Sequence, residues 1–265
     1  MTTTSPATGV ALRRIFDDAS QFPPGNLSLT DAIANHRRWR ASEFEPMVGR
    51  LLTPLAQFGA LVEALGADDH WELGVIVPAD APATAAAEAA AALASTGATV
   101  TAIEMPVSAD SGAWAAAFPA ATVYLEGTAA DVPTIVERGA HAKIRTGGLT
   151  PEAVPAPAAV AAFIRACAEA SLPFKATAGL HQPLRHHDAE VGADVHGFLN
   201  VLVATARALD GARADELRAT LLATDIGALS LECNLNAARR LFEGFGTCSI
   251  QEPIDALLDL GVLHG

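Results

Sequence analysis

The stretch HAKIRTGGLTPEAVPAPAAVAAFIRACAEASLPFKATAG, residues 141–179, decides the fold of this chain. It contains two short runs, HAKIRTGG (141–148) and PFKATAG (173–179), whose composition is typical of buried strands. Between them, PAAVAAFIRACAEAS (157–171) is typical of a helix. A strand, a helix and a second strand in this order predict two parallel strands joined by a crossover helix.

The same alternation continues on both sides of this stretch. Six more strands are predicted, in LRRIFDD (12–18), PMVGRLLTP (46–54), ELGVIVP (72–78), TVTAIEMPV (99–107), ATVYLEG (121–127) and EGFGTCS (243–249). Helix-like sequence follows the strands, and several helices end in glycine before the next strand. Eight predicted strands that alternate with helix-like segments predict an α/β fold with one (β/α)8 TIM barrel domain over residues 1–265. A doubly wound open sheet is the alternative, but no GxGxxG motif follows the first strand.

One connection is much longer than the others. Residues 182–235, between the seventh and eighth strands, exceed the few residues that usually join a strand to a helix. An insertion on the C-terminal side of a barrel strand lies over the catalytic face. We therefore expect residues 182–235 to form an inserted helical lid, or a contact segment through which copies associate as a homo-oligomer.

Composition restricts the partners and the compartment. A formal net charge of −13 argues against nucleic acid and against an anionic membrane surface as the main partner. Three cysteines without a CxxC motif indicate reduced thiols. The first ten residues have neither the basic nor the apolar region of a signal peptide, so we expect a cytoplasmic protein.

The chain has two lysines against 15 arginines, and both lysines lie in the stretch quoted above. Side chains alternate along a strand, so Lys143 and Arg145 share one face, and Ile144 takes the other. Ile144 and Phe174 suit the helix layer, which sends Lys143 and Lys175 into the lumen on neighbouring strands about 4.8 Å apart. Burial and a like charge both lower a lysine pKa, so we expect a neutral amine that can form a Schiff base. A carboxylate, foremost Glu104, is expected to bridge the two ammonium groups.

Three motifs resemble one enzyme family. Lys143-Ile144-Arg145-Thr146-Gly147 resembles the K-x-x-T-G of strand six in class I aldolases of the deoxyribose-phosphate aldolase type. Lys175 and Gly179 are similarly placed to the K-A-x-x-G of that family's strand seven, and GFGTCS (244–249) resembles its phosphate-binding turn after strand eight. The resemblance, which covers the second half of the chain, implies that Lys143 forms the Schiff base and that Lys175 activates it. It also implies an acidic partner, for which Glu104 and Asp18 are the candidates.

The remaining candidates follow from their places at strand ends. Four carboxylates lie at the ends of predicted strands and can exchange protons beside the lysines: Glu104, Glu126, Asp17 and Asp18. His181 follows the seventh strand directly. Arg50 and Arg145 can hold an anionic group bidentately, or can form salt bridges to these carboxylates. The expected anion-binding residues are Arg50, Arg145, Thr146, Gly147, Gly148, Thr177, Gly179, Gly246, Thr247 and Ser249.

The sequence therefore predicts an aldolase-like lyase that acts on a small carbonyl compound without a cofactor and without a metal. Two other functions stay open. One is a metal-dependent barrel lyase or isomerase whose ligands are Glu104, Glu126 and His181. The other is a non-enzymatic barrel used for binding or assembly. Cys248 is either a nucleophile or, as small thiols more often are, a packing residue.

Overall fold

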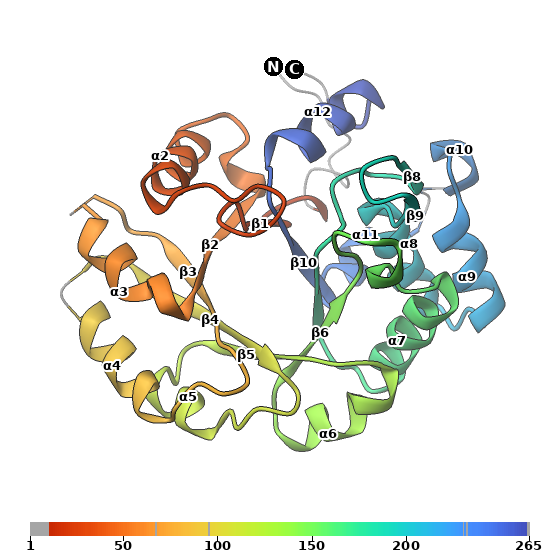
Figure 1. Ribbon diagram of the computed structural model, residues 1–265. Helices are drawn as coiled ribbons and strands as arrows, with labels where there is room; N and C mark the ends of the chain where they lie inside the picture. Colours follow the sequence, from red (N-terminus) through yellow and green to blue (C-terminus); the bar gives the residue numbers. More distant parts are fainter. Residues whose placement is uncertain (1–10, 67, 95, 230, 232, 264–265) are drawn as a thin grey trace.

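The computed structural model describes residues 11–66, 68–94, 96–229, 231 and 233–263. Eight parallel strands close into a barrel, with helices outside it (Figure 1). The predicted (β/α)8 fold is confirmed. The first ten residues, which carry no signal-peptide pattern, lie outside the described part. The barrel strands are β1 (Phe16–Asp18), β2 (Val48–Pro54), β3 (Glu72–Ile76), β4 (Thr99–Pro106), β5 (Thr122–Glu126), β6 (His141–Arg145), β7 (Phe174–Thr177) and β10 (Phe242–Thr247).

The strands pair in sequence order, and β1 closes the barrel against β10. The connecting helices are α2 (Leu29–Arg40), α3 (Leu55–Ala64), α4 (Thr84–Leu93), α5 (Gly112–Ala117), α6 (Val132–Glu137), α7 (Pro157–Glu169) and α12 (Gln251–Asp259). Short 3-10 turns lie at Glu45–Met47, Ala129–Asp131 and Pro151–Ala153. Helix α7 is an example of the amphipathic spacing that forms these helices. Its buried residues, Val160, Phe163, Ile164 and Cys167, recur at three- and four-residue intervals and lie on one face.

Alternation along the strands separates the two faces as predicted. The Phe174 ring of β7 points outward and lies 5.4 Å from the Phe163 ring of α7. The Phe16 ring of β1 lies 5.8 Å from that of Phe198, which is also outside the barrel. Because neighbouring side chains on a strand point to opposite faces, Asp17 and Lys175 are directed into the lumen.

The long connection after β7 has two parts. A small antiparallel hairpin comes first, made of β8 (His186–Asp188) and β9 (Ala193–Val195). Four helices follow among the described residues of this segment: α8 (Phe198–Leu209), α9 (Ala214–Leu222), α10 (Ile226–Leu229) and α11 (Leu235–Ala238). Helices α8 and α9 lie beside α7, outside the barrel (Figure 1). Helix α8 is almost wholly buried there, because its apolar residues occur on every side.

This arrangement corrects one expectation. The helices of residues 182–235 do not extend over the mouth; the residues of this segment that line the mouth cavity belong to the hairpin and its flanks. A lid or an oligomer contact stays a prediction for this segment. None of the helices in the described part of the chain has both the length and the hydropathy that a membrane span requires.

Candidate active site

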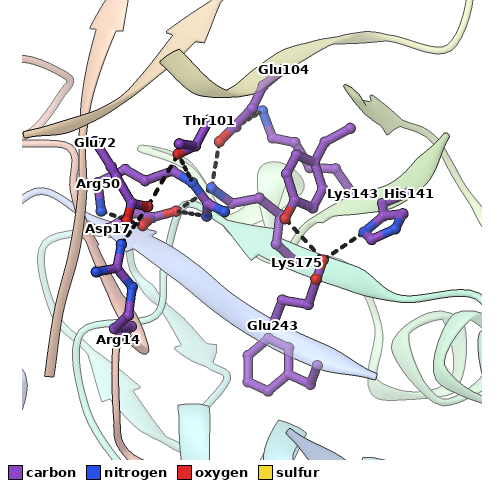
Figure 2. A network of polar contacts seen from close by, with 12 residues as sticks. Arg14, Asp17, Arg50, Glu72, Thr101, Glu104, His141, Lys143, Lys175 and Glu243 are labelled. Atoms are coloured by element: carbon purple, nitrogen blue, oxygen red, sulfur yellow. Dashed lines mark hydrogen bonds and ion pairs between the residues drawn. The ribbon is translucent and has the colours of Figure 1, made fainter. Parts of the chain in front are cut away.

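The centre of this barrel is charged, whereas the lumen of a TIM barrel is usually filled with layers of branched apolar side chains. Ten side chains form a chain of contacts along the barrel axis, which we call the lumen network (Figure 2 shows most of it). From the N-terminal end of the barrel to its C-terminal mouth, the members are Arg14, Glu72, Thr101, Arg50, Asp17, Lys175, Glu104, Lys143, Glu126 and Arg145.

The two lysines are the centre of the lumen network. Lys143 and Lys175 are direct partners in the register of β6 and β7, and both point into the lumen. The Glu104 carboxylate, from β4, bridges them: Oε2 lies 2.8 Å from Lys143 Nζ, and Oε1 accepts a short hydrogen bond from Lys175 Nζ. The predicted lumen position of both lysines and the predicted bridge are thereby confirmed. All three side chains are almost fully buried, so each charge depends on the others.

Lys175 has a second anionic partner, which links it to the part of the lumen nearer the N-terminal end of the barrel. Its Nζ lies 2.5 Å from Asp17 Oδ2, and Asp17 Oδ1 accepts the backbone N–H of Arg50 at 2.8 Å. The guanidinium of Arg50 lies 3.4 Å from Asp17 and donates to the Thr101 hydroxyl. Arg50, an expected anion ligand, is therefore occupied by this carboxylate.

Toward the mouth, Lys143 has Glu126 as its second partner. Glu126 Oε2 lies 3.0 Å from Lys143 Nζ, and Glu126 Oε1 accepts a hydrogen bond from Arg145 Nε at 3.0 Å. The Arg145 side chain is 54% exposed, so the network ends in solvent. Cations and anions thus alternate along this half of the lumen.

The ion pairs of Lys143 with Glu104 and Glu126 determine its charge, and they shift its pKa in the direction opposite to the one expected. Burial favours the neutral amine, but Glu104 and Glu126 outweigh it and raise the pKa of Lys143 above its ordinary value. Burial likewise opposes the charged carboxylates, yet the neighbouring cations lower the pKa of Glu104 and of Glu126. The same balance lowers the pKa of Asp17 to about 2. Lys143 is therefore an ammonium ion at neutral pH, and the expected low lysine pKa is wrong.

Lys143 also lines a cavity of about 350 Å³ at the C-terminal mouth. Glu104, Glu126 and Arg145 share this cavity with it, and Pro54, Pro78 and Pro106 contribute apolar walls. Lys175, whose side chain is 1% exposed, lies behind Glu104. The cavity therefore presents one primary amine with two carboxylates beside it.

A second polar cluster lies on the N-terminal side of the lysines, and sequence reasoning missed it. Glu243 Oε2 accepts a hydrogen bond from the Tyr124 hydroxyl at 2.9 Å and lies 2.8 Å from His141 Nδ1. Lys175 Nζ is 5.4 Å from the centroid of the Tyr124 ring, so the ring face also faces this cation. A polar residue at the start of a barrel strand was the available signal for Glu243 and His141.

Two predicted catalytic residues lie apart from the lysines. Asp18, next to Asp17, points away from the lumen, where its Oδ2 lies 3.0 Å from His36 Nδ1 of α2. Asp17 takes the place that was expected for Asp18. His181 pairs instead with Glu252, at 3.1 Å.

The expected anion ligands at the ends of β6 and β7 hold the two strands together. The Thr146 hydroxyl donates to the carbonyl of Ala178 at 2.6 Å, and its backbone N–H donates to the carbonyl of Thr177. The backbones of Gly147 and Gly179 pack directly on each other. Thr146 therefore has no hydroxyl proton left for an anion.

The turn after β10 is also bonded internally. The Thr247 hydroxyl donates to the Ser249 carbonyl at 2.8 Å, and the Ser249 hydroxyl accepts the backbone N–H of Glu252. A side chain at Gly246 would press on Leu52 of β2. Of the expected anion-binding residues, Arg145, Gly148 and Gly179 line a second and larger cavity at the mouth, of about 590 Å³. His181, Cys248 and the β8–β9 hairpin line it too.

The metal hypothesis is not supported by the arrangement of its ligands. Among the described residues, no group of three or more histidine, cysteine, aspartate and glutamate side chains is placed to hold a metal ion. Glu104 and Glu126 meet Lys143, and His181 meets Cys248 and Glu252. The proposed site of Glu104, Glu126 and His181 is therefore not assembled.

The chain matches no protein-family model, and it matches no curated protein.

Proposed function

We propose that this protein is a lyase of the class I aldolase kind, in which Lys143 forms a Schiff base with a small carbonyl compound. The observation that carries the proposal is the position of Lys143 at a cavity wall, between Glu104 and Glu126. The resemblance of the Lys143 and Lys175 motifs to deoxyribose-phosphate aldolase-type enzymes supports it. The TIM barrel, whose C-terminal mouth is the usual place of an active site, is compatible with it.

The first step requires Lys143 to lose a proton, because only the neutral amine attacks a carbonyl carbon. Glu126 accepts this proton in our proposal and passes it to solvent, since its carboxylate lies 3.0 Å from Nζ and is a quarter exposed. The amine then forms the C–N bond, and the carbonyl oxygen takes up protons and leaves as water. The nitrogen becomes a protonated imine, so the positive charge returns to the atom that held it.

The anionic surroundings of Lys143 favour that product. Glu104 and Glu126 stabilise a cation at Nζ, and the protonated imine is such a cation. The same charge draws the electron pair of the breaking C–C bond toward the nitrogen, which yields an enamine and an aldehyde. A base must take the proton of the β-hydroxyl group, and Glu126 faces the cavity where that group lies.

Lys175 is a positioning residue in this mechanism. It holds Glu104 and Asp17 in place and contributes a second positive charge behind Lys143. An anionic group of the substrate would meet Arg145, which borders both mouth cavities.

Borohydride trapping tests the proposal sharply, because the chain has two lysines. Wild-type protein is incubated with a panel of aldehydes and keto acids, reduced, and weighed intact. We expect one adduct, on the peptide that contains Lys143. Lys143→Met should abolish the adduct and any C–C cleavage. Lys175→Met should leave a slower reaction, because the carboxylates released by Lys175 hold the remaining ammonium more tightly.

A non-enzymatic barrel is the competing function, and the complete pairing of both lysines favours it. Buried ion pairs of this kind can serve structure alone. In that case no compound of the panel gives an adduct on Lys143, and both lysine variants change only the free energy of unfolding.

A further inference from the structure

Three reactive side chains meet at the larger mouth cavity, on the other side of Arg145 from Lys143. Cys248 Sγ lies 3.8 Å from Nδ1 and 3.9 Å from Nε2 of His181. Glu252 Oε2 lies 3.1 Å from His181 Nδ1. All three side chains line the cavity of about 590 Å³, so a small molecule in it can reach the sulfur.

The three residues come from separate segments at the C-terminal side of the barrel. His181 follows β7, Cys248 follows β10, and Glu252 lies in the first turn of α12. None of them takes part in the lumen network described above. A thiol, an imidazole and a carboxylate in contact are the groups that generate a thiolate nucleophile in proteins.

We propose that Cys248, His181 and Glu252 form a second reactive centre, which holds a small aldehyde as a covalent hemithioacetal. The Cys248 sulfur adds to the carbonyl carbon, so a C–S bond forms and the C=O π bond breaks. The electron pair moves to the oxygen, and His181 delivers the proton that the thiol gave up. The addition is reversible and redox-neutral.

The groups present in this centre, one thiol and one imidazole held by a carboxylate, favour an aldehyde as the ligand. Addition of a thiol to an aldehyde breaks no σ bond and expels no leaving group, so a sulfur and one proton carrier complete the reaction. Glu252 binds Nδ1 and orients the ring, which leaves Nε2 to exchange the proton with sulfur or oxygen.

The charges around the centre favour an imidazolium beside the sulfur. Burial alone would lower the pKa of His181, but its contacts with Cys248 and Glu252 raise it to about 10. The other titratable and charged groups that line the cavity are Arg145, His186, Asp188 and Glu190. Cys233, in contrast, is a half-buried cysteine whose pKa is raised by burial. It is a built-in control.

Alkylation by iodoacetamide, read by peptide mass spectrometry, tests the centre without reference to the Lys143 reaction. At pH 7 we expect Cys248 to react at least tenfold faster than Cys233. Propionaldehyde should protect Cys248 and leave Cys233 unprotected, and His181→Gln should slow Cys248 about tenfold. Should His181→Gln not fold, Glu252→Gln, at a half-exposed position, should show a smaller slowing in the same direction.

Lys143→Met separates this centre from the proposed Schiff base. Protection of Cys248 by the aldehyde should persist in that variant. Protection that vanishes with Lys143 would assign the effect to the lysine and overturn the second centre. Equal alkylation of Cys248 and Cys233, or no protection by the aldehyde, would overturn it too.

Discussion

At the scale of single residues, the charge of Lys143 shows what a sequence conceals. The sequence places two lysines on adjacent strands, and like charges lower a lysine pKa. It does not show that Glu104 and Glu126 both reach Lys143, and these two anions reverse the direction. The effect of a buried charge depends on distances of a few ångströms, which a strand pattern does not fix.

The direction of the Lys143 shift makes the trapping reaction depend on pH. Because the pKa of Lys143 is raised, the amine is mostly protonated at pH 7, and its neutral fraction grows about tenfold per pH unit below that pKa. We expect the initial rate of borohydride trapping to rise in this way from pH 7 to 9. Intact mass at fixed aldehyde concentration measures it. A rate that is constant from pH 7 to 9 would contradict this expectation, because the attacking amine would then not arise by loss of a proton to solvent.

Asp17 is expected to make the stability of the fold depend on pH in the acid range, because its pKa is lowered in the folded protein. Its pKa is lowered from 3.8 to about 2 in the fold, so its contribution is present above pH 4 and is lost as the pH falls to 2. A shift of this size corresponds to about 2 kcal/mol. We expect Asp17→Asn to lower the free energy of unfolding in urea at pH 6 and to reduce its fall between pH 4 and 2. Glu126→Gln, at the solvent end, should cost less at pH 6. If the free energy of unfolding of Asp17→Asn fell between pH 4 and 2 as much as that of the wild type, this role would be contradicted.

The sequence offers both Asp17 and Asp18 at the end of the first strand, and strand alternation can decide between them. The argument that sent Phe174 outward and Lys175 inward applies equally to β1. Phe16 packs against the outer helices, so Asp17 must face the lumen and Asp18 the helix layer. Glu243 was harder to assign, because a register shift between Phe242 and Gly244 interrupts the alternation in β10.

At the scale of elements, the ends of β6 and β7 explain two glycines that were expected to bind an anion. A Cβ on Gly147 would lie 2.8 Å from the Gly179 Cα, closer than real Cβ atoms come to backbone. Gly179 also has a φ of +76°, which a side chain disfavours. These glycines let the strand ends approach, and the Thr146 hydroxyl joins the strands. A motif of Thr and Gly looks the same for either role.

We therefore expect Gly147→Ala to lower the free energy of unfolding by about 1–3 kcal/mol, because both neighbours are backbone and cannot rotate away. Urea unfolding followed by circular dichroism measures it. Gly59→Ala is the matched control, since Gly59 lies in α3 with no atom within 4 Å of an added Cβ. That change should stabilise the protein by about 0.5–1 kcal/mol. Similar effects of the two changes would show that β6 and β7 can separate at little cost.

At the scale of the whole molecule, the barrel was predictable and the insertion was not. Most barrel strands carry two or more apolar residues and lie between helix-like segments, which is a strong signal. The strands of the hairpin, HHD and ADV, are three residues long and mainly polar. They are too short to show the alternation of apolar and polar residues by which a strand is predicted. The sequence predicts helices after them, but the side of the barrel on which these helices lie depends on the packing of α8 against α7. The sequence does not reveal that tertiary contact.

The hairpin forms a sheet of its own, and this gives an expectation for the mouth as a whole. β8 and β9 pair with each other and not with the barrel, and the exposed Asp194 side chain lies 3.6 Å from Arg185. Replacing residues 187–194 by a short Gly-Ser turn removes mainly exposed contacts. We expect the free energy of unfolding to change by about 1 kcal/mol or less, as for other exposed pairs.

Because the hairpin lines the larger mouth cavity, alkylation of Cys248 should become faster, and more so for a bulky maleimide than for iodoacetamide. The rate at Cys233 should stay the same. A large loss of stability, or an unchanged Cys248 rate, would show that the hairpin supports the barrel and does not control access to its mouth.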